Sequence, residues 1–192
     1  MDARAKKKLI RVLSSILVGL VLVFAQKQGW LGQSGAPNTG GTVAPGMYRV
    51  VKFDDGDTIA VNMEGRTETI RFIGVDTPET HDPRKPVQCY GKTASAFTKK
   101  TIGTQNVRLE ADPESGNRDR YNRLLRFVYL PDGTLLNQKL VAEGYGFAIT
   151  GFPHTKMAQF VDAEKIAIDE KRGLWGSCQI EVVKGINRTA PE

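Results

Sequence analysis

The stretch "MYRVVKFDDGDTIAVNMEGRTETIRFIGVDTPET", from Met47 to Thr80, predicts three consecutive β-strands. Its β-branched and aromatic residues gather in "MYRVVKF", "TIAVNM" and "TETIRFIGV", and this composition is typical of strands. "DDGD" separates the first strand from the second, and "EGR" is typical of a hairpin turn. Pro78 ends the third run because proline has no amide hydrogen to donate to a sheet. The fold therefore begins with three strands joined by short turns.

The pattern after this stretch completes a small barrel. Residues 90–102 have helix formers with apolar residues at helical spacing, and residues 106–111 and 123–130 are strand-like. Residues 134–144 predict a short helix closed by Gly144, and residues 155–173 predict a longer one. Five short strands with a helix between the third and fourth are the elements of an OB-fold. We predict an α+β fold, a five-stranded OB-fold Greek-key β-barrel with three α-helices.

The N-terminus has the pattern of an export segment. A basic start, "MDARAKKKLIR", precedes 14 uncharged, mainly apolar residues, Val12 to Ala25. As a helix this run spans about 21 Å, whereas the hydrocarbon core of a bilayer is roughly 30 Å thick. The length favours a signal peptide cleaved after Ala25, and the alternative is an uncleaved membrane anchor through residues 12–25. Both interpretations leave the rest of the chain outside the cytoplasm.

Composition divides the chain into four segments. Residues 1–25 are the signal peptide or anchor, and residues 26–46, rich in Gly, Ser, Thr and Pro, are a flexible linker. Residues 47–180 form the folded domain, and residues 181–192 are a C-terminal tail. The net charge is +6, of which residues 1–25 carry +4. The remaining +2 is too small to identify a nucleic-acid-binding protein by charge alone.

Acidic residues gather at two strand ends. Asp54, Asp55 and Asp57 lie at the first strand break, and Asp76 and Glu79 lie at the end of the third strand. Sheet pairing can bring the two groups together. Carboxylates without His or Cys favour a hard cation such as Ca²⁺ or Mg²⁺. Taken alone, "DDGD" is more typical of an ordinary Asp-Gly turn than of a metal site.

Arg71 lies five residues before Asp76 on the same predicted strand. Strand alternation would place the two side chains on opposite faces. A bend or bulge near Gly74 would let both address one site.

A basic loop, "RDRYNR", follows the fourth strand and contains Arg118, Arg120, Tyr121 and Arg123. Arginine forks suit phosphate recognition, and a tyrosine ring offers a surface on which a base can stack. The alternative is a solvated basic loop without a ligand.

The two cysteines, Cys89 and Cys178, lack the close spacing of a thiolate metal site. In an exported chain they can form one disulfide, which would close a long loop and stabilise the fold by about 4 kcal/mol in the chain-entropy description. The alternative is two separate thiols.

Five motifs together resemble the staphylococcal nuclease (thermonuclease) family. They occur in the family's order and cover about residues 47–178. They are "DGDT" from Asp55, "RFIGVDTPET" from Arg71, "YGKTASAFTKK" from Tyr90, "DRYNRLL" from Asp119 and "GLW" from Gly173. The resemblance implies an OB-fold and a Ca²⁺-dependent endonuclease that cleaves DNA and RNA at the 5′ P–O bond and leaves 3′-phosphates.

The resemblance also assigns roles to individual residues. Those that bind the metal would be the carboxylates of Asp57 and Asp76 and the backbone carbonyl of Thr77, with Asp55 supporting them. Those that act on the substrate would be Glu79 as the candidate general base, Arg71 and Arg123 as phosphate clamps, and Arg120 and Tyr121 beside the nucleotide.

We expect a monomer that prefers single-stranded substrates. Thr150 and Phe152 stand where the family often has tyrosines for the base, so base preference does not follow from the resemblance. The rival hypothesis is a non-catalytic OB-fold module that binds nucleic acid or protein. The complete set of acidic and arginine residues favours the enzyme.

Overall fold

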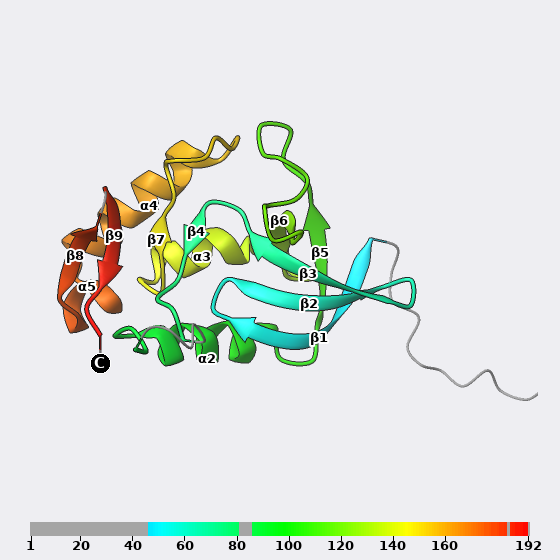
Figure 1. The fold of residues 1–192 in the computed structure, drawn as a ribbon, viewed down its shortest axis with the longest axis horizontal. Coiled ribbons are helices and arrows are strands. Elements are labelled where there is room, and N and C mark those ends of the chain that lie inside the picture. Colours follow the sequence, from blue (N-terminus) through cyan, green and yellow to red (C-terminus); the bar gives the residue numbers. More distant parts are fainter. Residues whose placement is uncertain (1–45, 81–85, 184, 192) are drawn as a thin grey trace, which may run out of the picture. The chain divides into compact units, whose positions relative to one another are not determined.

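Five strands close into a barrel in the order β1-β2-β3-β6-β5. All neighbouring pairs are antiparallel except β3 and β6, which run parallel. This arrangement confirms the predicted OB-type barrel (Figure 1). The strands are β1 (Met47–Asp55), β2 (Thr58–Met63), β3 (Arg66–Phe72), β5 (Asn106–Glu110) and β6 (Leu124–Tyr129).

The computed structural model describes residues 46–80, 86–183 and 185–191. The predicted export segment lies outside the described residues, as does the linker apart from Gly46. In the part that is described, no helix combines the length and the apolar composition needed to cross a bilayer.

Three helices of about two turns or more are present, as predicted, and a fourth segment makes a single turn. Within α2, Ala94, Thr98 and Ile102 are spaced four residues apart and are fully buried, so they form one stripe on the helix. Gly103 ends this helix with a φ of 57°. The helices are α2 (Gly91–Ile102), α3 (Leu136–Ala142), α4 (Met157–Asp169) and the single turn α5 (Leu174–Ser177).

A sharp turn at Gly74 ends the third strand earlier than the sequence predicted. The predicted strand continued through Val75, but β3 stops at Phe72, and Val75 begins β4 (Val75–Asp76), which pairs with β7 (Phe147–Ala148) in a separate sheet. Gly74 has a φ of 77°, and a Cβ atom there would lie 2.7 Å from Cε1 of His154. Only glycine suits both conditions. The structure therefore contains the bend near Gly74 that the sequence analysis named as the condition for Arg71 and Asp76 to address one site.

Asn137 of α3 holds this turn from inside the protein. Its side chain is fully buried, and its Nδ2 donates hydrogen bonds to the carbonyl oxygens of Ile73 (2.9 Å) and Arg126 (3.1 Å). Its Oδ1 accepts a hydrogen bond from the Val128 amide at 2.8 Å. Because buried polar groups are costly when they lose their partners, this network fixes the path of the chain between β3 and β4.

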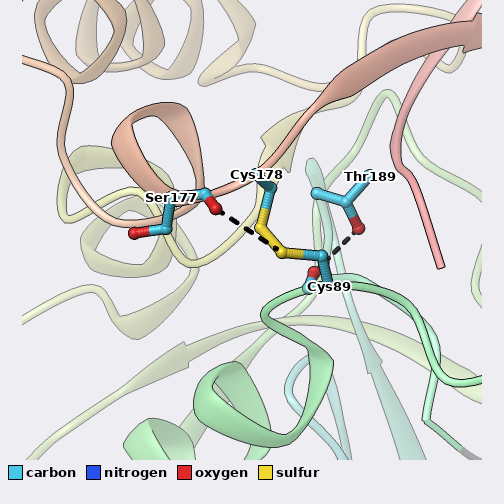
Figure 2. Close-up of a disulfide and its surroundings, with 4 residues drawn as sticks. All are labelled: Cys89, Ser177, Cys178 and Thr189. Carbon is cyan, nitrogen blue, oxygen red and sulfur yellow. Dashed lines mark hydrogen bonds between the residues drawn. A yellow bond between two sulfur atoms is a disulfide. The ribbon is translucent and has the colours of Figure 1, made fainter. Parts of the chain in front are cut away.

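The segment expected as a C-terminal tail contains a β-hairpin. β8 (Ile180–Val183) pairs antiparallel with β9 (Ile186–Thr189). Figure 2 shows how the hairpin is joined to the start of α2: a disulfide links Cys89 to Cys178, and Thr189 Oγ1 donates to the Cys89 carbonyl at 2.8 Å. Cys89 Sγ also lies 3.9 Å from the Ser177 carbonyl, which is a packing contact because a disulfide sulfur carries no hydrogen.

Candidate active site

The guanidinium of Arg71 lies between two carboxylates. Its Nη1 is 3.1 Å from Oδ2 of Asp57, and its Nη2 is 2.6 Å from Oδ1 of Asp76. Nη1 also donates to the carbonyl oxygens of Val75 (2.6 Å) and Phe72 (3.1 Å). The turn at Gly74 folds Asp76 back toward Arg71, so two side chains five residues apart meet at one place.

Asp57 is held rigidly at the start of β2. The residue is 5% exposed, and its Oδ2 accepts hydrogen bonds from the amide (2.8 Å) and the hydroxyl (3.1 Å) of Thr77. Its Oδ1 accepts a third bond from the Thr58 hydroxyl at 2.9 Å. These contacts and the charge of Arg71 fix the orientation of a buried carboxylate that would otherwise be costly to desolvate.

Asp55 connects the end of β1 to the segment that carries Glu79. Its Oδ1 accepts hydrogen bonds from the Gly56 amide (2.9 Å) and from the Thr80 hydroxyl (3.1 Å). Burial raises the pKa of Asp55 to about 7, and the charges of Asp57 and Glu79 contribute to the rise, while the two hydrogen bonds oppose it. Asp55 therefore lies in the negative field of its neighbours.

Asp76 and Glu79 complete the group. Loss of water raises the pKa of Asp76, Asp57 and Glu79 add to the rise, and Arg71 opposes it. The side chain of Asp76 is nevertheless 42% exposed, so one edge of this carboxylate faces solvent. Glu79 Oε1 accepts a hydrogen bond from the Thr80 amide at 3.0 Å, and the Glu79 amide donates to Gln88 Oε1 at 2.7 Å.

We call Asp55, Asp57, Asp76 and Glu79 the carboxylate cluster. Their charges act on one another in a confined space, and such a field favours a bound cation. Oxygen donors without His or Cys suit a hard divalent ion. Within residues 46–80, 86–183 and 185–191, no three acidic, His or Cys side chains are grouped so that they could hold a metal by themselves. A metal here would need backbone and water oxygens beside Asp57 and Asp76, and Ca²⁺ accepts both.

A pocket of about 700 Å³ adjoins the cluster, and Arg71 lines it. We call this the arginine pocket. Arg71 is thus shared between the carboxylate cluster and the pocket. The pocket is also lined by residues of the loop before β6 and of the segment after β7, among them Arg118, Asp119, Arg120, Tyr121, Arg123, Ile149, Phe152 and His154.

The loop before β6 presents one aromatic ring between two arginines. Tyr121 is 64% exposed, and the guanidinium carbons of Arg120 and Arg123 lie 4.7 Å and 5.3 Å from its ring centre. Asp119 Oδ2 accepts hydrogen bonds from Arg123, with Nε at 2.7 Å and Nη2 at 2.6 Å. Burial raises the pKa of Asp119, but its hydrogen bonds and the charge of Arg123 outweigh this and lower the pKa below its usual value. The loop is therefore held in its conformation by contacts between its own residues.

The structure brings the predicted site residues together in two groups. Thr77 lies against Asp57 in the carboxylate cluster, and the arginines and tyrosine of the basic loop line the pocket. Phe152, at a position where tyrosine was noted as the family's common residue, is 75% exposed at the rim of the pocket.

Sequence reasoning missed three residues near the site. Gln88 holds the Glu79 amide, and no sequence pattern indicates this contact. Ile186 of β9 lines the arginine pocket, and the charge of Arg188 acts on Asp76. The β-branched residues of "IEVVKGINRT", which stand on both sides of a Lys-Gly pair, are a hairpin signal that would have predicted β8 and β9.

His154 is a buried packing residue. It is 3% exposed, and its ring lies 5.2 Å from that of Phe160 and 6.0 Å from that of Phe127, measured between centres. Burial lowers its pKa, which favours the neutral form of the ring. Its main contact with the site is steric, because it lies against Gly74 and maintains the turn.

Comparison with known proteins agrees with this geometry. The sequence model described as "Staphylococcal nuclease homologue" matches residues 69–177, more than half of the chain. A thermonuclease of Staphylococcus hyicus is 39% identical over 170 residues, covering 88% of this chain and 96% of that protein. A thermonuclease of Staphylococcus intermedius is 44% identical over 129 residues, covering 67% and 75%. Endonuclease YncB of Bacillus subtilis (strain 168) is 38% identical over 135 residues, covering 69% and 63%. The chain belongs to the staphylococcal nuclease family and is a hydrolase of phosphodiester bonds in nucleic acids.

Proposed function

We propose that this protein is a Ca²⁺-dependent nuclease that acts outside the cytoplasm on both DNA and RNA. It would act there as a released protein, or as an anchored one if residues 12–25 are retained. The observation that carries the proposal is the position of Arg71, which contacts both Asp57 and Asp76 and also lines the arginine pocket. A phosphate that enters from the pocket would meet an arginine fork and a carboxylate-held cation together.

Asp57, Asp76 and the carbonyl oxygen of Thr77 would hold the ion. When bound, Ca²⁺ offsets the charge of a phosphate oxygen and favours the ionised form of a nearby water. Asp57 is buried and restrained by Thr77, so it provides a fixed ligand, while the exposed edge of Asp76 leaves the ion accessible to the substrate. Asp55 keeps Thr80, and with it the Glu79 segment, beside these ligands.

Glu79 would take the proton from the attacking water. Its hydrogen bonds to Thr80 and Gln88 restrain the backbone and the carboxylate, as a general base requires. The oxygen of the water forms a new bond to phosphorus, and the 5′ P–O bond breaks, leaving a 3′-phosphate. The departing 5′-oxygen takes a proton from solvent, because arginine, with a pKa above about 12, is a poor acid.

Arg71 and Arg123 would stabilise the charge that develops on the phosphate oxygens. Arg71 has five donors, and among the described residues its Nε makes no hydrogen bond, so donors remain for a phosphate. Tyr121 and Arg120 would hold the neighbouring nucleotide. Because the Tyr121 ring is exposed for stacking on an unpaired base, single-stranded substrates are preferred. The barrel acts as a monomer.

The test is cleavage of a labelled single-stranded DNA, and of an RNA of the same sequence, by the full chain. We expect cleavage of both in Ca²⁺, no cleavage in excess chelator, and 3′-phosphate ends on the products. Activity that survives chelation would contradict the metal role. Binding in Ca²⁺ without cleavage would instead support the non-catalytic OB-fold module.

A further inference from the structure

The last strand of the chain, β9, reaches the active site. Ile186 at its start lines the arginine pocket together with Arg71 and Arg123. Residues two apart on a strand point to the same face. Arg188 therefore lies on the same face of β9 as Ile186, the face that borders the pocket.

The guanidinium of Arg188 makes no ion pair within the described part of the protein. Its positive charge opposes the rise in the pKa of Asp76 that burial causes, which agrees with its place on the face of β9 that borders the pocket. Arg71, Arg118 and Arg123 each form an ion pair with a carboxylate. For Arg188, no acidic side chain of the described residues lies within ion-pair distance, including Glu181, its partner in the hairpin register. This half-buried guanidinium has donors available for a ligand.

The hairpin holds Arg188 in place. The Cys89 amide donates to the Ala190 carbonyl at 2.8 Å, and the Thr189 hydroxyl donates to the Cys89 carbonyl at 2.8 Å. The disulfide joins Cys89 to Cys178 just before β8 (Figure 2). Gln88, the neighbour of Cys89, holds the Glu79 amide. The same short segment therefore anchors both β9 and Glu79, so Arg188 is fixed relative to the site.

We infer that Arg188 is a substrate-positioning residue that binds a phosphate of the nucleic-acid strand next to the phosphate that is cleaved. The inference rests on the proposed nuclease function. A strand that enters an anionic carboxylate cluster is repelled at every phosphate that no cation contacts. Arg71 and Arg123 line the pocket, and Arg188 adds a third guanidinium on the face of β9 that borders it. A guanidinium without an internal partner is suited to that contact.

The experiment measures binding without turnover. In excess chelator, fluorescence anisotropy would give the Kd of a labelled single-stranded oligonucleotide at several salt concentrations. Each phosphate contact contributes about 0.7 to the slope of log K against log salt for a single strand. We expect Arg188→Gln to raise the Kd by about 10-fold and to lower the slope by about 0.7. Arg188→Lys keeps the charge, so it should preserve the slope and weaken binding by less than Arg188→Gln does.

The matched control is Arg66→Gln, which removes the same charge at an exposed position. Arg66 is the first residue of β3, at the opposite end of that strand from Arg71. It should change neither the Kd nor the slope appreciably. In Ca²⁺, Arg188→Gln should raise KM and leave kcat close to that of the wild-type chain, because a positioning contact is made in the ground state too. Intact mass with the disulfide formed, and an unchanged urea midpoint, would show that the variants are folded.

The inference fails if Arg188→Gln matches Arg66→Gln in Kd and slope while the wild-type chain still cleaves DNA. A wild-type chain that neither binds nor cleaves DNA in Ca²⁺ would overturn the proposed function itself. The two failures are thus distinguishable.

Discussion

Arg71→Lys is expected to lower kcat/KM on single-stranded DNA by about 10²- to 10³-fold, the usual effect of removing a donor to a transition-state oxygen. Lysine retains the charge but loses the planar fork. In the structure this fork contacts Asp57 and Asp76 and the carbonyl of Val75 at once, and lysine cannot reproduce all of these contacts. The loss should appear mainly in kcat, because the fork is needed most when charge builds on the phosphate.

Steady-state kinetics in Ca²⁺ would measure this effect, with urea unfolding as a check on stability. Arg71 also ties the turn at Gly74, so a drop in stability alone must be separated from the loss of rate. The matched control is Arg108→Lys, the same substitution at a partly exposed arginine of β5 that pairs with Glu110. If Arg71→Lys has the same kcat and KM as the control, Arg71 does not act as a phosphate clamp.

Glu79→Gln should reduce kcat by about 10²- to 10⁴-fold, the range that general acid–base catalysis contributes, while DNA binding in chelator stays intact. Glutamine cannot accept the proton of the attacking water. Its Oε1 can still accept the hydrogen bond that Thr80 donates, so the segment should keep its shape. The effect therefore reports chemistry rather than folding.

Single-turnover cleavage at saturating enzyme separates this step from product release. Glu143→Gln is the control, because Glu143 is exposed after α3 and pairs only with Lys139 among the described ion pairs. A rate for Glu79→Gln near that of the wild-type chain would remove Glu79 as the base and show that its negative charge is not needed for cleavage.

The barrel and its helices were predictable because their signals are local. Strand composition, turn residues and the helical spacing of Ala94 and Ile102 each act over a few positions. The "EGR" turn is one example: Glu64 and Gly65 both adopt positive φ, as a tight hairpin requires. The sequence could predict that Arg71 and Asp76 share a site only on the condition that the chain bends at Gly74. The bend depends on the fit of His154 against that glycine, a contact between residues 80 positions apart.

The C-terminal part of the site was not predicted, because it also depends on contacts between residues far apart in the sequence. The sequence offered the cysteine pair as one of two alternatives, and the structure joins Cys89 to Cys178. That link brings the segment described as a tail beside the start of α2 and carries Ile186 to the pocket. Neither the composition of residues 181–192 nor their charge indicates such a position. The position of this segment is determined by the disulfide and by hydrogen bonds to residues far away in the sequence.

Ca²⁺ binding to the wild-type chain and to Asp76→Asn, measured by titration calorimetry, tests the proposed metal site directly. Asp76 suits the test because its partly exposed side chain can lose its charge with less risk to the core than buried Asp57. Asp169→Asn, at an exposed position in α4, is the matched control. We predict one Ca²⁺ per wild-type chain, unchanged binding for Asp169→Asn, and affinity lowered by more than about 10-fold for Asp76→Asn, since Ca²⁺ affinity depends on the number of charged ligands. Equal Ca²⁺ affinity in Asp76→Asn and wild type, or no binding to the wild-type chain, would contradict the account.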